Sequence, residues 1–132
     1  MIDKKISADQ FSRSIEEILG PIEPAIARQM PQALSASLQL GKRHVVANAS
    51  GLFGGTGRYL SGWSARRDPM PGGEWEGHIY NKDLPGLPHL LEKGHAKVGG
   101  GRVQGREHIA PAAKDTFEDF GRRVERAVDK AL

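Results

Sequence analysis

Two short pieces of sequence decide how this chain can fold, LPHLLEKGH at residues 87–95 and HIAPA at residues 108–112. In the first piece, Leu90 and Leu91 can anchor the segment in a core. Gly94 can then turn the chain, because glycine accepts backbone conformations that other residues avoid. The two pieces also hold three of the five histidines, His89, His95 and His108. No nucleophile or cofactor loop accompanies these histidines, so the pieces favour an architectural role.

Upstream of these pieces, the sequence predicts two helices, over residues 7–19 and 24–49. The first has apolar residues at helical spacing, with Ser7 in the position of a helix cap. The second contains Pro31, which must kink or divide it because proline lacks an N–H and clashes with the preceding turn. The segment 51–57 is too rich in glycine for regular structure, so it is predicted to be a loop.

A third helix is predicted over residues 111–131, with Pro111 in its first turn. Its apolar face includes Phe117, for which truncation to alanine is expected to cost about 3–5 kcal/mol. On the outer side we expect favourable ion pairs four residues apart. These are Glu118 with Arg122 and Asp119 with Arg123.

The middle of the chain, about residues 58–110, is predicted to be rich in β-structure. Residues 59–66 and 74–80 alternate in the manner of strands and are separated by a Pro/Gly turn, so they should pair as an antiparallel hairpin. Trp63 and Trp75 are then core residues or a cross-strand pair. The segment Lys97–Gly105 is interpreted as a flexible loop or a hairpin tip. The element order predicts one α+β domain over residues 1–132, with helices on one face of a small antiparallel sheet.

Composition narrows the function classes. The net charge is +3, from 19 basic and 16 acidic residues, which is too mixed to indicate nucleic-acid binding by itself. The chain has no cysteine and therefore no disulfide. We find no signal peptide and no apolar run long enough to span a bilayer, and we expect folding in the cytoplasm. The 17 glycines suggest a modest core that completes its burial in an oligomer.

Neither a cofactor nor a metal is expected. The histidines lack the spacing of a compact zinc site. The loop 51–57 lacks the spacing of a phosphate-binding Walker A loop. We instead expect His89 and His108 to be partly buried and hydrogen-bonded to the backbone. Glu92 is expected to pair with Lys93, with Arg102 or with a neighbouring subunit.

The two pieces together resemble a known signature, H-L-L-E-x-G-H-x followed by H-I-x-P-A. It is similar to that of the gene-ten-type minor tail proteins of lambdoid siphophages, which are tail-completion or neck proteins. The resemblance covers about half the chain and extends to Ile79-Tyr80-Asn81, although Lys93 stands where the family often has an aromatic residue. The residues that carry the motif are Thr56, Gly57, His89, Leu90, Leu91, Gly94, His108 and Pro111.

This resemblance implies a non-enzymatic virion component. Such a subunit forms a ring, expected here to be a hexamer, at the head-proximal end of the tail. Its partners are copies of itself and the tail terminator, tail tube or head-completion proteins. Phage DNA would pass through the ring without specific contacts, and no membrane is involved. We place the interface at Glu92, Lys93, His95, Lys97, Arg102 and Arg106. The alternative is a nucleic-acid-binding or metal-dependent nuclease-like domain that uses the central histidines with Arg102 and Arg106.

Overall fold

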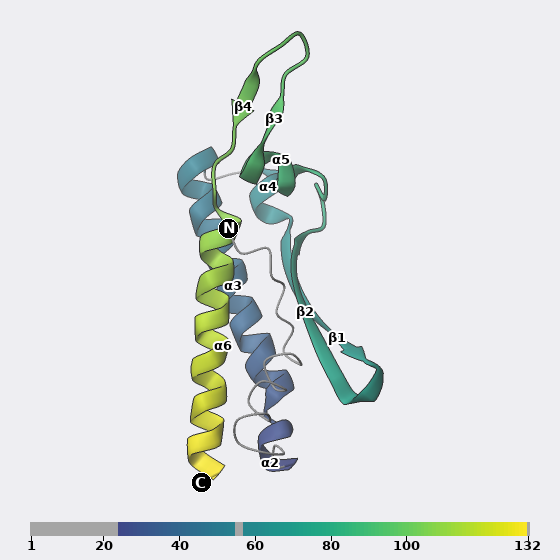
Figure 1. Cartoon of the computed structure of the whole chain (residues 1–132), viewed down its shortest axis with the longest axis vertical. Helices are drawn as coiled ribbons and strands as arrows, with labels where there is room; N and C mark the ends of the chain where they lie inside the picture. Colours follow the sequence, from purple (N-terminus) through teal and green to yellow (C-terminus); the bar gives the residue numbers. More distant parts are fainter. Residues whose placement is uncertain (1–23, 55–56, 132) are drawn as a thin grey trace.

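A computed structural model describes residues 24–54 and 57–131, and the helix predicted over residues 7–19 lies outside this range. Two long helices, α3 (Met30–Phe53) and α6 (Ile109–Ala131), run antiparallel along the length of the molecule (Figure 1). A hairpin of β1 (Trp63–Met70) and β2 (Glu74–Asn81) packs mainly against α3. The architecture is α+β, as predicted from the element order.

Shorter elements connect these parts. Among the described residues they are α2 (Pro24–Ala27), α4 (Arg58–Ser61), the 3-10 turn η1 (Pro71–Gly73), α5 (Leu87–Lys93), β3 (Gly94–Ala96) and β4 (Arg102–Gln104). The strands β3 and β4 form a second antiparallel hairpin, which projects from one end of the helix pair (Figure 1). The segment Lys97–Gly105 is therefore partly a strand and partly a hairpin tip.

The helix predicted over residues 24–49 is divided next to Pro31. The first part, α2, ends at Ala27, and α3 begins at Met30. Proline is well tolerated in the first turn of a helix, where its missing N–H would have had no partner. The second part continues past the predicted end to Phe53, and Gly54 stops it with a φ of 96°.

The strand predicted to begin at Tyr59 begins at Trp63 instead, so this boundary is wrong. Tyr59 belongs to the helical turn α4, and its ring is buried. The alternation of residues 59–62 is compatible with a strand or with one helical turn, and the aromatic core around Tyr59 decides between them. The antiparallel hairpin itself is confirmed, with Ala65 opposite Ile79.

The two tryptophans lie at opposite ends of this hairpin. Trp63 is opposite Asn81, whereas Trp75 is opposite Pro69, so they form no cross-strand pair. Trp63 is a core residue with 3% of its surface exposed. Trp75 is half-buried, and the guanidinium of Arg67 lies 4.8 Å from the centroid of its ring.

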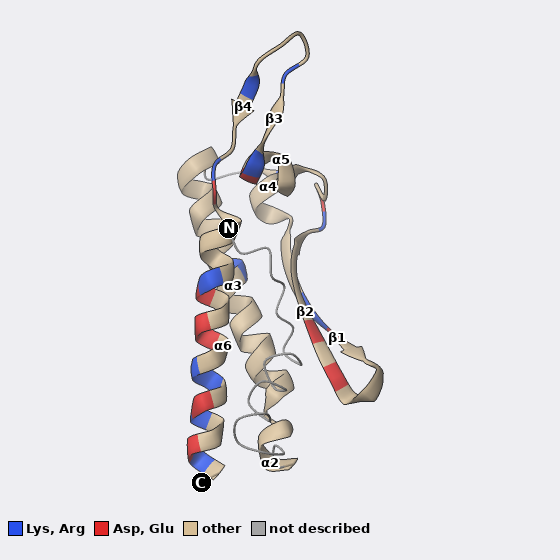
Figure 2. Ribbon diagram, in the orientation of Figure 1, with Lys and Arg blue, Asp and Glu red and all other residues tan. Residues whose placement is uncertain are grey.

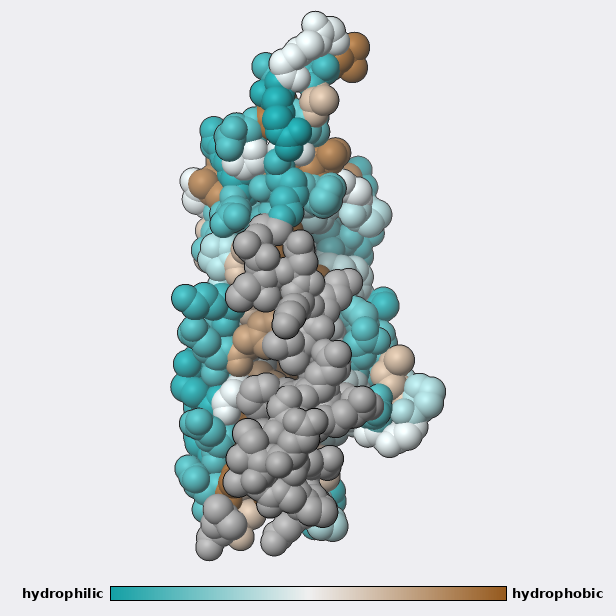
Figure 3. Space-filling view, in the orientation of Figure 1, coloured by the Kyte–Doolittle hydropathy of each residue, from teal (hydrophilic) through white to brown (hydrophobic). Residues whose placement is uncertain are grey.

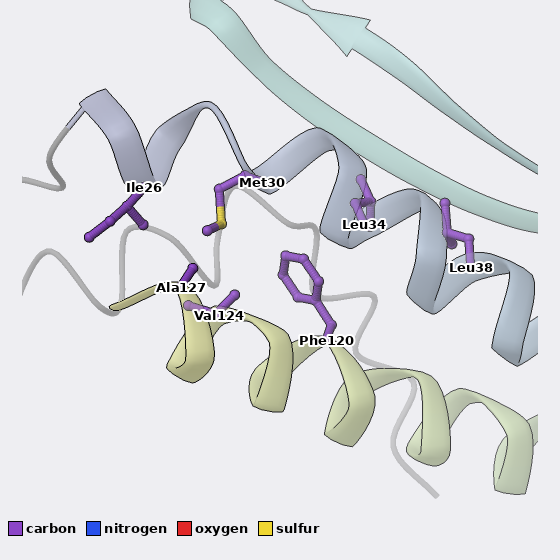
Figure 4. Close-up of a cluster of buried hydrophobic side chains, with 7 residues drawn as sticks. All are labelled: Ile26, Met30, Leu34, Leu38, Phe120, Val124 and Ala127. Carbon is purple, nitrogen blue, oxygen red and sulfur yellow. The ribbon is translucent and has the colours of Figure 1, made fainter. Parts of the chain in front are cut away.

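One of the two hydrophobic cores, which we call the aliphatic cluster, holds the start of α3 against the end of α6 (Figure 4). Met30 and Phe120 point toward each other between α3 and α6, whereas Leu34 and Leu38 point from α3 toward the strands, where they lie against Gly77 of β2. The members are Ile26, Met30, Leu34, Leu38, Phe120, Val124 and Ala127. Phe117, predicted to be a core residue, is only half-buried and lies outside this cluster, because its position on α6 turns it toward the edge of the contact with α3.

Gly41 marks a close approach of α3, α6 and β2. A Cβ atom at this position would collide with the Thr116 hydroxyl of α6 and the Ile79 side chain of β2. The absence of a side chain lets the two helices and the sheet meet at one point. We infer that any larger residue at position 41 would separate them.

The ion pair between Asp119 and Arg123 forms, at 2.7 Å, but the prediction that Asp119 faces outward is wrong. Asp119 is buried and also accepts a hydrogen bond from the Ser37 hydroxyl of α3, at 2.8 Å. Burial alone would raise the pKa of Asp119. The hydrogen bonds from Arg123 and Ser37 and the charges of Arg123 and Arg122 outweigh burial and hold that pKa below its usual value.

Candidate interaction site

The carboxylate of Glu92 caps the first turn of α6. One carboxylate oxygen accepts hydrogen bonds from the backbone N–H groups of His108 and Ile109, at 2.8 and 2.9 Å. The other accepts one from the N–H of Ala110, at 2.9 Å. A carboxylate is favoured here because the N-terminus of a helix carries a partial positive charge. We call this arrangement, Glu92 with residues 108–110, the carboxylate cap.

Pro111 completes the cap. A helix leaves its first four N–H groups without partners inside the helix. In α6, Glu92 accepts hydrogen bonds from three of them, and the next residue, Pro111, has no N–H at all. The spacing of Glu92, His108 and Pro111 in the sequence thus satisfies this buried helix end completely.

The placement of Glu92 corrects the interpretation made from sequence. Glu92 was expected at a surface contact, paired with Lys93, Arg102 or another subunit, but only 8% of its surface is exposed. It lies on the inner side of α5, where the helix α5 packs over the start of α6. The sequence pattern could not reveal this, because the three N–H donors come from a segment 16 to 18 residues away.

His108 is fully buried behind the cap. Its Nδ1 lies 2.8 Å from the carbonyl oxygen of Arg106 and 3.0 Å from the carboxylate of Glu92. Both neighbours are acceptors, so we place a proton on Nδ1, which donates to them. Its Nε2 shares a hydrogen bond with the hydroxyl of Tyr59. The prediction that His108 is hydrogen-bonded to the backbone is confirmed.

Rings surround His108. Phe53, Tyr59 and Trp63 each meet it edge-to-face, with centroids 5.1, 5.7 and 6.4 Å from that of the imidazole. We call this second core, with its aliphatic neighbours, the aromatic cluster. Its buried members are Val45, Ala49, Tyr59, Trp63 and Ala112. Burial, together with the nearby charge of Glu92, raises the pKa of Tyr59 to about 12.

Asn81 ties the sheet to this cluster, and sequence reasoning did not single out its role. Its side-chain amide donates a hydrogen bond to the carbonyl oxygen of Tyr59, at 2.7 Å. Its side-chain oxygen accepts one from the N–H of Leu84, at 2.9 Å. Only the resemblance at Ile79-Tyr80-Asn81 pointed to this residue.

Gly94 lets the chain leave the cap and cross closely over itself. It ends α5 with a φ of 80°. A Cβ atom on Gly94 would collide with the backbone of Val103 and Gly105, and one on Gly105 would collide with the carbonyl oxygen of Glu92. The pair Gly94 and Gly105 therefore allows β3 and β4 to rise directly from the capped helix.

The remaining residues of the signature differ in how deeply they are buried. Leu91 packs against the aromatic cluster, as an anchor should. The expectation that Leu90 also lies in the core is wrong, because 40% of its surface is exposed. His89 is exposed as well, so its predicted hydrogen bond to the backbone near the sheet is wrong. Both residues lie on the outer face of the short helix α5, since only one side of so short a helix can face the core. Thr56 lies outside the described residues, and Gly57 precedes α4 with a φ of 107°.

The hairpin of β3 and β4, with its flanking residues, forms an exposed arm of basic character (Figure 2). We call residues 93–106 the basic arm. Its four charged side chains are exposed: Lys93, Lys97, Arg102 and Arg106. Arg102 and Arg106 each donate a hydrogen bond to a backbone carbonyl, of Lys93 and Leu52 respectively. His95 is half-buried at the base of the arm.

The structure separates the histidines that were considered as metal ligands. Among residues 24–54 and 57–131, no three His, Asp or Glu side chains come together as metal ligands. His89 is exposed on α5, whereas His108 is sealed in the aromatic cluster. Within the same residues, no helix is both long and apolar enough to cross a membrane.

Known protein families, curated protein sequences and solved structures give no match to this chain.

Proposed function

We propose that this protein is a structural subunit of a phage particle, a tail-completion or neck protein that forms a ring at the head-proximal end of a long tail. In this proposal the residues of the signature build a shape, and turnover of a substrate plays no part. The ring would be a hexamer, made of copies of this chain, and would join the tail tube or tail terminator to the head-completion proteins.

The carboxylate cap carries this proposal. The two pieces that resemble the tail-protein signature meet in space, because Glu92 of the first piece binds the backbone of residues 108–110 in the second. Their shared task is to fix α5 and the basic arm on the end of α6. Glu92, residues 108–110 and Pro111 satisfy one another's hydrogen-bonding requirements at this helix end, as the residues of an architectural module should.

Exposure supports the same conclusion. The basic arm projects beyond the helix pair (Figures 1 and 3). Val98, between the two strands of the arm, is fully exposed. A hairpin that projects from the body of a subunit can reach a neighbouring copy. Ring-forming subunits make such contacts head to tail.

The test is genetic and microscopic. Deleting the gene from the phage or prophage that encodes this chain should give full heads and separate tails, and supplying the chain in trans should restore joined particles. Electron microscopy of lysates measures the joined fraction. Normal virions from the deletion strain would contradict the proposal.

A nuclease assay distinguishes the structural proposal from the alternative of a metal-dependent nuclease. The full chain would be incubated with plasmid DNA and Mg²⁺, Mn²⁺ or Zn²⁺, alongside the variant His95→Ala. We expect no cleavage by either protein. Cleavage that requires a metal and is lost in the variant would replace the structural proposal with a metal-dependent nuclease.

A further inference from the structure

We propose that the basic arm of one subunit docks on the outer face of the β1–β2 hairpin of a second copy of this chain, near the tip of that hairpin. This inference rests on the proposed ring and names the contact that would hold it together. Charge, exposed apolar residues and the position of the two surfaces on the molecule each support it.

The whole positive balance of the chain resides in the arm. Residues 93–106 contain four basic and no acidic residues, while the other 118 residues contain 15 basic and 16 acidic ones. Two carboxylates flank the arm in the sequence: Glu92 is buried in the cap, and Glu107, which follows Arg106 at the base of the arm, is exposed. The arm beyond its base is therefore basic, and it complements a partner surface of the opposite charge.

The outer face of the β1–β2 hairpin offers such a surface. Alternation along the strands places Asp68, Glu74 and Glu76 on the face away from α3, and Asp68 is directly opposite Glu76. In Figure 2 the ribbon of this hairpin is red, the colour of Asp and Glu, on β2. Arg66 and His78 share the face: Arg66 lies 3.1 Å from Asp68 and stacks on Tyr80, and the imidazole of His78 lies 3.4 Å from Asp68 and 3.7 Å from Glu76. Three carboxylates on one face with a single arginine leave it acidic toward the tip.

The two tips are complementary in their exposed apolar residues as well as in their charges. Met70 lies at the tip of the β1–β2 hairpin, directly opposite Glu74, and is 40% exposed. Val98 lies at the tip of the arm between Lys97 and the glycines 99–101. Each tip therefore presents one apolar side chain beside charges, and the charges on the two tips have opposite signs. Docking would remove both apolar groups from water while the charges set the register.

The two tips lie at opposite ends of the molecule, so one subunit cannot bring its own arm to its own hairpin (Figure 1). The contact must form between copies. Because it joins two different surfaces, it is heterologous, and such contacts close into rings when the rotation between neighbours permits.

Charge reversal tests the contact. We would compare the full chain with an arm variant, Lys97→Glu with Arg102→Glu, and a tip variant, Glu74→Lys with Glu76→Lys. Sedimentation velocity at low ionic strength measures self-association. Each variant is expected to raise the dissociation constant at least about tenfold, since like charges then face each other across the contact. Added salt should weaken the wild-type association.

Rescue excludes misfolding as the explanation. An equimolar mixture of the two variants should associate again, because every contact between unlike variants pairs opposite charges. A chain carrying all four substitutions should also associate. The control Lys114→Glu with Lys130→Glu changes the net charge as the arm variant does, on exposed positions of α6. It should associate as the wild type does.

Several results would overturn the inference. A wild-type chain that is monomeric at every soluble concentration, or reversals without effect, would do so. Failure of the mixture to associate would do so too. Rings that persist in both variants would reject this contact and leave the ring proposal standing. If the arm variant lost binding to duplex DNA in a mobility-shift assay while self-association was unchanged, the arm would face nucleic acid instead.

Discussion

The two ends of the α3–α6 pair are held together by different physics. At one end, the aliphatic cluster packs Phe120 of α6 against α3, and Leu34 and Leu38 of α3 against the β1–β2 hairpin, with the Asp119 ion pair at its edge. At the other end, the aromatic cluster surrounds a buried histidine, and a buried carboxylate binds the start of α6. The first end depends on volume and the second on hydrogen-bond geometry.

This difference determines how well each end of the helix pair tolerates substitutions. Apolar packing is not directional, so volume-conserving exchanges in the aliphatic cluster should cost little. Hydrogen bonds to buried groups are directional, and leaving a partner unsatisfied costs its full desolvation. The end that carries the basic arm should therefore be the more sensitive to single substitutions.

The largest expected effect is at the carboxylate cap. Glu92→Lys removes the acceptors of three N–H groups and places a cation at the positive end of α6. We expect the free energy of unfolding to fall by about 4–5 kcal/mol, measured by urea denaturation of the full chain. The control Glu107→Lys reverses an exposed charge beside the same helix end and should cost less than about 1 kcal/mol. Equal losses in the two variants would show that the cap does not distinguish this end of the molecule.

At the aliphatic end, Phe120→Ala should cost about 3–4 kcal/mol, because it removes a ring that is 5% exposed. The half-buried Phe117 provides the comparison, and Phe117→Ala should cost less than about 2 kcal/mol. Urea denaturation of both variants measures the difference. If Phe117→Ala were the more damaging of the two, the placement of the core on this face of α6 would be wrong.

The smallest expected effect tests the hydrogen bond between Tyr59 and His108. Tyr59→Phe removes the hydroxyl that His108 Nε2 binds and should cost about 1–2 kcal/mol. The pKa of Tyr59 is raised from 10.0 to about 12 in the folded chain. Its stabilising contribution is therefore complete below pH 10 and is lost as the pH rises to 12.

Denaturation curves between these pH values provide the readout. Tyr59→Phe should flatten the alkaline fall in stability, whereas Tyr80→Phe, on the outer face of the hairpin, should leave it in place. An unchanged alkaline slope in Tyr59→Phe would show that this tyrosine is not the group that titrates.

Local sequence signals predicted the helices and strands better than they predicted which residues contact one another. The helical spacing of apolar residues predicted α3 and α6, and Pro31 predicted the break between α2 and α3. Alternation located the β1–β2 hairpin, but it could not distinguish a strand from one helical turn at Tyr59. Signals that repeat within a few residues survive in the sequence, because every turn or pleat must bury the same face.

The placement of single polar residues was the part that the sequence could not supply. Glu92 and His89 are three residues apart on α5, yet one is sealed against the start of α6 and the other is exposed. Which side of so short a helix is covered depends on segments distant along the chain.

The sequence by itself determined the α+β class, the division at Pro31 and the turn at Gly94, because these follow from backbone chemistry and local periodicity. Only the tertiary structure decided that Glu92 is a helix cap and that His108 is enclosed by aromatic rings. Each of these depends on contacts between segments far apart in the chain. Such contacts form only when the whole core assembles, and no local pattern records them.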